Sequence, residues 1–433
     1  MIYIRGNRAD YDSWRDLGNV GWGFAELLPY FKKSENQERG PSQYHGVGGP
    51  VNVADPRYVN PLTRAFLAAA EQIGIALNPD FNGDVQDGAA LYQVTQKNGA
   101  RWGAADGYLQ PARGRSNLTL ITGAQATRVL IEKGRAVGVA FLRDGAMEEA
   151  RAAGEVILAG GTVNSPQLLL LSGIGPADEL KAAGISAIHD LPGVGKNLQD
   201  HPMVSVGYLC TQRVSLDGAE TVGNFMRWLL WKNGPLASNV AEAGLFLRTR
   251  AGLAVPDLQL LFGPAYYRGH GLVRRKEHCF GFGPTLITPE SRGVISLRSA
   301  DPLDAPAIRA NYLSTDADLR TMIAGVRLAR RLAHANAFDA FRGAELHPGA
   351  AQQSEAEISD FLRNELETLY HPVGTCKMGV DALAVVDAQL RVRGMEGLRV
   401  VDASIMPRVP AGNTNAPVMM IAEKAAEMIR AGA

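Results

Sequence analysis

A histidine directly before a proline is the strongest candidate for proton chemistry in this sequence. It is His371, in the run Tyr370-His371-Pro372. Proline restrains the residue before it to extended backbone, so this imidazole sits on a fixed corner of the chain. A neutral imidazole accepts a proton near neutral pH because its unperturbed pKa is about 6.5. Taken alone, such a histidine is more often a structural corner residue than a general base.

Three glycine- or asparagine-rich loops could bind an anionic ligand. Each follows an expected strand and opens a helix, which exposes backbone N–H groups and the positive end of the helix dipole. One such loop would be weak evidence, since most glycine turns are only turns. Three together predict a dinucleotide or flavin site. The loops are residues 159–161, 191–197, and 402–404 leading into 412–415.

Four short strands are expected upstream of the first of these loops, at 126–131, 136–142, 147–152 and 155–159, with Lys-Gly and Asp-Gly turn signals between them. The last strand is apolar throughout, which is typical of a central parallel strand covered on both faces. We expect Asn164 or Ser165 to cap the helix that follows, with Pro166 in its first turn. The pattern is strand, glycine turn, helix.

Capping signals place the later helices. Thr315-x-x-Asp318 and Ser354-x-x-Glu357 each precede a run with apolar residues at helical spacing. At the C-terminus, a strand at 398–404 is followed by a loop and a helix with Pro417 in its first turn. The chain of 433 residues exceeds the size at which one hydrophobic core usually keeps growing, so two packed domains are expected.

The composition excludes several classes of protein. Lys and Arg number 44 and so do Asp and Glu, which leaves no net field to hold nucleic acid. Three cysteines without ligand spacing indicate neither a disulfide framework nor a metal site. No uncharged apolar run reaches the roughly 18 residues of a membrane span. These features predict a cytoplasmic protein with at most peripheral membrane association, on the inner membrane face.

Four motifs resemble those of the glucose, methanol, choline (GMC) family of flavin-dependent oxidoreductases. They are GTVNSPQLLLLSGIG at 161–175, LPGVGKNLQDHP at 191–202, HPVGTCKMG at 371–379 and VVDASIMPRVPAGNTNAPVMMIAEK at 400–424. Within the family, the sequence is most similar to choline dehydrogenase-like and primary-alcohol dehydrogenases. The motifs occur in the family's order, and the resemblance spans essentially the whole chain. The family's N-terminal GxGxxG unit has no counterpart in the 433 residues, so the resemblance implies an N-terminally truncated member that retains little FAD.

The resemblance implies an α/β fold. It consists of a doubly wound, Rossmann-like FAD-binding domain at 1–205, completed by 372–433. A second, α+β substrate domain at 206–371 contains an antiparallel sheet. The implied reaction is oxidation of a primary alcohol, choline-like, aliphatic or aromatic, to an aldehyde, by proton abstraction and hydride transfer to flavin N5. A quinone or another electron acceptor would then reoxidise the flavin.

The resemblance also assigns site residues. His371 matches the catalytic histidine, and Asn415 is taken as the second catalytic residue. Glu242 matches a recurrent glutamate beside the substrate pocket, where a substrate contact and a structural hydrogen bond are equally open. His201 is expected to be structural. The residues expected at the cofactor are Tyr3, Ala126, Asp402, Ala403, Asn413, Thr414, Asn415 and Pro417.

Three alternatives remain open at this level. The first is an oxidase of the same fold that uses O2, and the second is a lyase of the hydroxynitrile type, in which FAD plays no redox part. The third is an inactive truncated fragment. Flavin bleaching by alcohol would exclude the lyase, and stoichiometric peroxide would indicate the oxidase.

Overall fold

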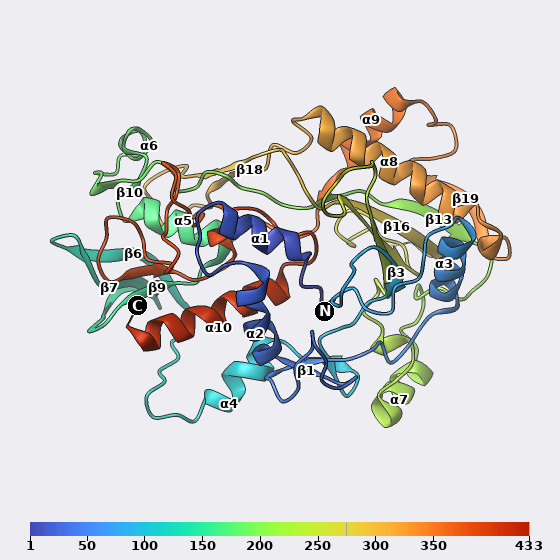
Figure 1. Cartoon of the computed structure of the whole chain (residues 1–433), viewed down its shortest axis with the longest axis horizontal. Helices are drawn as coiled ribbons and strands as arrows, with labels where there is room; N and C mark the ends of the chain where they lie inside the picture. The colour runs from blue at the N-terminus through green and yellow to red at the C-terminus, as the bar shows by residue number, and fades with distance from the viewer. Residues whose placement is uncertain (274, 433) are drawn as a thin grey trace.

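The computed structural model describes residues 1–273 and 275–432. Figure 1 shows a large sheet with α3, α8 and α9 at one end of the molecule, and α5, α6, α10 and a β-meander at the other. Helices α1 and α2 lie between these two regions. Each region has its own cluster of buried apolar side chains.

An eight-stranded sheet forms one half of the molecule. Its main strand order is β19-β13-β16-β15-β14-β3, with β12 pairing both β16 and β20, and all its pairs are antiparallel. Two strands, β3 and β12, come from outside the 206–371 range expected for this domain, and β12 ends just before that range. The strands are β3 (Gly88–Leu91), β12 (Pro202–Met203), β13 (Val206–Cys210), β14 (Ala243–Leu247), β15 (Leu258–Gly263), β16 (Cys279–Leu286), β19 (Arg342–His347) and β20 (Glu367–Thr368).

Helices cover one face of this sheet. The core between them includes side chains from α3 (Pro61–Gln72), α8 (Asp316–Ala333) and α9 (Glu355–Glu365). The two expected caps are confirmed: the hydroxyl of Thr315 accepts from the Asp318 N–H, and Ser354 forms a full capping box with Glu357. The opposite face of the sheet turns toward the candidate site described below.

The second half holds the strand, glycine turn and helix expected from the sequence. Strands β6 (Ala124–Glu132), β7 (Arg135–Arg143) and β8 (Ala146–Arg151) form the predicted meander. Strand β9 (Val156–Leu158) pairs in parallel with β21 (Leu398–Val400). Among the described residues β9 has this one partner strand, and Ile157 is 43% exposed, so the expected covering on both faces is not seen.

The helix after β9 begins earlier than expected. Helix α5 runs from Gly161 to Leu171, so Pro166 lies inside it rather than in its first turn. Proline has no N–H to bond the carbonyl four residues earlier. The carbonyl of Thr162, freed in this way, accepts from the hydroxyl of Thr375 at 2.6 Å. Ser165 does not cap the helix; its hydroxyl donates to Asp402.

The last helix, α10 (Asn415–Ala431), has Pro417 in its first turn, as predicted. None of the helices in the described ranges is both long and apolar enough to cross a membrane. The remaining helices are α1 (Arg8–Asp16), α2 (Phe24–Ser34), α4 (Gln110–Ala112), α6 (Ala177–Ala182) and α7 (Val222–Trp231). The remaining strands are β1 (Glu35–Gln37), β2 (Val51–Val53), β4 (Gln96–Lys97), β5 (Ala100–Arg101), β10 (Ile174–Gly175), β11 (His189–Asp190), β17 (Val294–Ser296) and β18 (Ala307–Arg309).

Candidate active site

His371 is buried and fixed through its backbone. Asp200 is the group that holds it: Oδ1 of this carboxylate accepts from the N–H of His371 at 2.9 Å and from the N–H of His201 at 2.8 Å. The other oxygen, Oδ2, accepts from the hydroxyls of Tyr312 and Thr368. One saturated carboxylate therefore joins the two histidine-bearing loops.

The imidazoles of the two histidines form a chain of hydrogen bonds whose direction can be deduced. Nε2 of His201 lies 3.2 Å from the carbonyl of Ile287, which can only accept, so Nε2 carries the hydrogen. Nδ1 of neutral His201 is then an acceptor, and it lies 3.0 Å from Nδ1 of His371, which must donate. Nε2 of His371 is consequently free of hydrogen and accepts from the amide of Asn413 at 3.1 Å.

Both imidazoles are held neutral. Burial lowers the pKa of His371 from 6.5 to about 3 and lowers the pKa of His201 well below its usual value. Asp200 bonds only to the backbone N–H of His371, so it does not contact the ring. A neutral ring with a bare Nε2 has the protonation state that a general base requires.

The orientation of Asn413 is fixed from its other side. Nε2 of Gln259, on β15, donates to the hydroxyl of Tyr92 at 2.9 Å and approaches Oδ1 of Asn413 at 3.4 Å. The amide nitrogen of Asn413 therefore faces His371. It carries two hydrogens, and His371 uses one of them.

Sequence profiles described as GMC oxidoreductase match residues 1–203 with the N-terminal domain and 289–422 with the C-terminal domain. The chain belongs to the GMC oxidoreductase family. An alcohol dehydrogenase [acceptor] of Pseudomonas putida is 45% identical over 442 residues, which cover 99% of this chain and 79% of that protein.

Other relatives support the same family assignment. The mitochondrial choline dehydrogenase of Homo sapiens is 44% identical over 437 residues, covering 99% of this chain and 73% of the relative. The solved structure of pyridoxine 4-oxidase from Mesorbium loti superposes with a TM-score of 0.90 at 31% identity, covering 100% of this chain and 82% of the other. The predicted family, FAD-binding fold, FAD cofactor and oxidation of a primary alcohol are confirmed.

This GMC oxidoreductase places Asn415 differently from the sequence interpretation. Asn415 is exposed, as the first residue of α10, and the amide that contacts His371 belongs to Asn413, two residues earlier. The loop before α10 turns so that these two asparagines face different surroundings. Thr414 precedes the helix without a side-chain cap bond, so the first N–H groups of α10 have no capping side chain from it.

The remaining cofactor positions fit FAD to different degrees. Oδ2 of Asp402 accepts from the N–H of Gly161 at 2.9 Å, and Ala403 follows it, so this loop abuts the start of α5. Ala126 lines a hollow of about 270 Å³ together with Ala159 and Gly160, at the carboxyl end of β9. Nucleotides bind beyond the carboxyl ends of parallel strands.

The structure therefore offers FAD a hollow whose lining includes Ala126, Ala159 and Gly160, and a helix N-terminus at α10 without a side-chain cap. Tyr3 lies elsewhere, in the apolar core, where its hydroxyl is 3.4 Å from Nε of Arg5. Burial raises the pKa of Tyr3 to about 12. The side chain of Tyr3 thus packs in the core and does not line the hollow beside Ala126.

Glu242 accepts hydrogen bonds from groups at the start of α3. Its carboxylate is fully buried and accepts from the N–H of Asn60 at 2.8 Å, the hydroxyl of Thr63 at 2.7 Å and the hydroxyl of Ser238 at 2.6 Å. Asn60 is the N-cap of α3, so Glu242 stabilises the start of that helix. Of the two roles left open by the sequence, these contacts favour the structural hydrogen bond.

Two site residues were missed by the sequence interpretation as catalytic neighbours: His201, expected to be structural only, and Gln259. A signal for His201 was present, because His201-Pro202 repeats the dipeptide His371-Pro372. Proline holds both histidines in extended backbone. Gln259 gave no signal, since a glutamine in an apolar strand reveals its partner only when the sheet is assembled.

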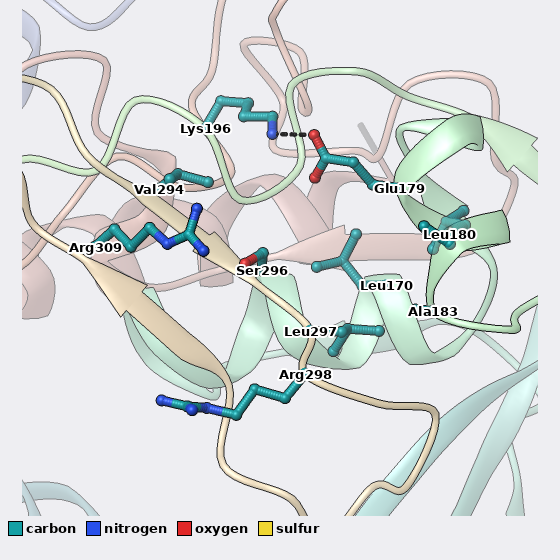
Figure 2. Close-up of a pocket in the computed structure, with 11 residues that line it drawn as sticks. Leu170, Glu179, Leu180, Ala183, Lys196, Val294, Ser296, Leu297, Arg298 and Arg309 are labelled. Carbon is teal, nitrogen blue, oxygen red and sulfur yellow. Dashed lines mark hydrogen bonds and ion pairs between the residues drawn. The ribbon is translucent and has the colours of Figure 1, made fainter.

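Another cavity, of about 340 Å³, lies between α6 and the β17–β18 hairpin (Figure 2). It is lined by several cationic side chains, but Lys196 pairs with Glu179. Figure 2 shows the guanidinium of Arg298 pointing away from that of Arg309. The positive charges do not converge on one point, so the cavity is a poor candidate for a second site that binds an anionic ligand.

Proposed function

We propose that His371 is the general base that removes the hydroxyl proton of a primary alcohol, through Nε2. The observation that carries this proposal is the hydrogen-bond chain from Ile287 through His201, which leaves Nε2 of His371 without a hydrogen. Bound FAD supplies the acceptor for the hydride that leaves the alcohol carbon. The alcohol loses one proton and one hydride and becomes an aldehyde.

Asn413 positions the alcohol oxygen. In the structure its amide donates to Nε2 of His371, whose single lone pair accepts one hydrogen. The alcohol O–H would take that place at Nε2, and the amide would then donate to the substrate oxygen, whose negative charge grows as the proton leaves. The oxygen is then held between the acceptor Nε2 and the amide donor. Asn415, Thr414 and Pro417 form the start of α10, whose N–H groups and dipole would favour the negative charge of the reduced cofactor.

The domain division is also part of the proposal. Residues 1–205 with 372–433 would form the FAD-binding domain and 206–371 the substrate domain. Helix α3 and strand β3 pack with the substrate domain, although both lie in the first range. His201 and His371 stand at the two boundaries, so each catalytic loop would lie between the domains.

We further propose a membrane quinone as electron acceptor, with peripheral membrane association through α7. This helix has no buried residue. Apolar side chains at i, i+3, i+4, i+7 and i+8 face solvent: Val222, Phe225, Met226, Leu229 and Leu230, with exposures from 43% to 80%. A soluble helix turns such a stripe inward, whereas an interfacial helix lays it into lipid.

The remaining contacts of α7 suit a membrane surface. The indole of Trp228 donates to the carbonyl of Gly99 at 2.9 Å, which anchors the helix to the body of the protein. Nζ of Lys232 lies 4.4 Å from the ring of Trp228, at the end of the helix. Arg227 and Lys232 would meet anionic headgroups.

The reaction class is tested by mixing FAD-loaded protein with a primary alcohol without oxygen. Loss of the visible absorbance of oxidised flavin, with formation of aldehyde, is the expected result. Stable absorbance with every alcohol would overturn the proposal. Reoxidation by a quinone analogue faster than by O2, without stoichiometric peroxide, is expected for the acceptor; stoichiometric peroxide would indicate an oxidase.

A further inference from the structure

An apolar cavity of about 230 Å³ lies on the site-facing side of the large sheet. Its walls include Leu369, two residues before His371, and Met203, two residues after His201. The N–H of Leu369 donates to the carbonyl of His201 at 2.9 Å, which joins these two walls. The cavity is therefore built from the same loops as His201 and His371.

The register of β15 and β16 shows how the cavity extends from the site. Gln259 pairs with Thr285, Leu261 with Gly283, and Gly263 with Gly281. Alternate residues of a strand share one face, so these three rows lie on the face where Gln259 meets Asn413. Successive rows are about 7 Å apart, so the cavity begins about one row from the catalytic amide.

Glycine creates the space. In the outermost row Gly263 and Gly281 face each other without side chains, and both line the cavity. In the next row, a Cβ on Gly283 would lie 2.8 Å from Sδ of Met203. When the hydroxyl of a substrate contacts His371, the rest of the substrate would lie against these glycines of the sheet.

The lining carries no charged side chain. Its polar side chains are Ser205, Asn239 and Tyr267, and the rest are glycine or apolar. Burial, helped by the nearby carboxylate of Glu367, raises the pKa of Tyr267 to about 12, so the phenol is neutral. The ring of Phe282 packs against Phe262 at 5.3 Å between centroids, among aromatic rings of the sheet core. No aromatic cage is formed by the lining residues.

Two carboxylates close in sequence to lining residues, Glu242 and Glu367, already have partners. The carboxylate of Glu242 is saturated at the start of α3, as described above. Glu367 accepts from the N–H of His270 at 3.1 Å and lies 3.6 Å from the imidazole of that residue. Neither carboxylate lines the cavity. A quaternary ammonium group placed there would lose its hydration without gaining an ionic partner.

We infer that this cavity selects a neutral, apolar primary alcohol, with one aromatic ring or a medium-length alkyl chain, over a choline-like cation. The inference rests on the proposed function of His371. An apolar cavity of about 150 Å³ holds one benzene molecule, so this cavity accommodates a ring with a short substituent. α7 connects through residues 235–237 to Asn239 and Val240 of the cavity wall, which places the apolar pocket beside the proposed membrane surface.

The test compares benzyl alcohol with choline in FAD-loaded protein, and toluene with tetramethylammonium as ligands that cannot be oxidised. We expect kcat/KM for benzyl alcohol to exceed that for choline at least about 100-fold, because the cation stays unpaired. We also expect toluene, but not tetramethylammonium, to raise the unfolding temperature. Comparable kcat/KM values, or a preference for choline, would overturn the inference. If no alcohol bleaches the flavin while toluene still binds, the cavity assignment stands and the proposed function fails.

A substitution inside the cavity sharpens this test. Met203→Glu introduces a carboxylate of similar length, and Met203→Gln is the matched neutral control. We expect Met203→Glu to shift the ratio of choline to benzyl alcohol oxidation at least about tenfold toward choline, and Met203→Gln to leave it near the parent value, because only the carboxylate can pair with the cation. Equal shifts in both variants would contradict the inference. If Met203→Glu does not fold, the comparison of ligands in the unmodified protein still decides.

Discussion

Nδ1 of His201 lies 3.0 Å from Nδ1 of His371. Since Nε2 of His201 is committed to the carbonyl of Ile287, this contact sets which nitrogen of His371 carries the hydrogen. His201 is thus a positioning residue: it acts on the substrate only through the tautomer of His371.

Two substitutions of His201 separate that role from simple packing. His201→Asn keeps an acceptor near the position of Nδ1, whereas His201→Gln keeps a polar group near Nε2 and loses that acceptor. We expect His201→Gln to slow flavin reduction by alcohol about 10- to 100-fold, the scale of losing an orienting partner, and His201→Asn to recover most of it. Rapid-mixing rates across pH provide the measurement. Equal rates in both variants would show that the tautomer is not set by His201.

The two asparagines of the last loop should behave differently. Asn413→Ala removes the amide at Nε2 of His371, and we expect flavin reduction to slow about 100-fold, as for loss of one donor to a developing oxyanion. Asn415→Ala is the matched control at an exposed position. We expect it to change the reduction rate less than threefold, or about 0.6 kcal/mol. Reversed effects would return the catalytic role to Asn415.

Acid should destabilise the fold through the buried histidines. Their pKa values are depressed in the folded protein, to about 3 for His371, while in the unfolded chain they are about 6.5. Stabilisation is thus complete above pH 6.5 and is lost as pH falls toward 3. Each histidine can lower the free energy of unfolding by at most about 1.4 kcal/mol per pH unit. Denaturant titrations at several pH values give the free energy of unfolding of the parent and of a His201→Asn/His371→Asn variant. We expect this free energy to fall less steeply with decreasing pH in the variant. Equal pH dependence in both proteins would contradict the assignment.

Membrane association through α7 has a closely matched control. Leu230 on α7 and Leu303 on a distant loop are each 60% exposed. We expect Leu230→Lys to weaken binding to vesicles of phosphatidylcholine and phosphatidylglycerol about tenfold, since a buried leucine contributes about 2 kcal/mol, and Leu303→Lys to leave it unchanged. Cosedimentation measures both. Absence of vesicle binding in the parent, or self-association that Leu230→Lys disrupts, would make α7 an interface between copies instead.

Local signals in the sequence predicted a large part of this fold. The caps at Thr315 and Ser354, the meander and the occurrence of a strand before α5 all depend on residues close in sequence. Pro166 led to a wrong prediction of where α5 begins. The hydrogen bond that a proline inside the helix cannot make is replaced by one from the hydroxyl of Thr375 to the carbonyl of Thr162. That contact joins residues more than 200 positions apart, and no local pattern contains it.

The sequence proposes His371 as the base because its motif and its proline are local, and that assignment stays a prediction. Asn413 and Asn415 are two positions apart, and which of them meets His371 depends on the turn of a loop held by distant partners such as Gln86, which bonds the carbonyl of Ala411. The direction of Glu242 was equally undetermined, because its partners at the start of α3 lie about 180 residues away.

The most direct test of the account is the rate at which an alcohol reduces the flavin in FAD-loaded His371→Ala and His371→Asn proteins, measured by rapid mixing without oxygen. His371→Asn preserves a polar partner for His201 and serves as the control for folding. Loss of the base at Nε2 predicts rates at least about 100-fold below the parent in both variants, with FAD still bound. A reduction rate within about threefold of the parent in either variant would show that His371 is not the base.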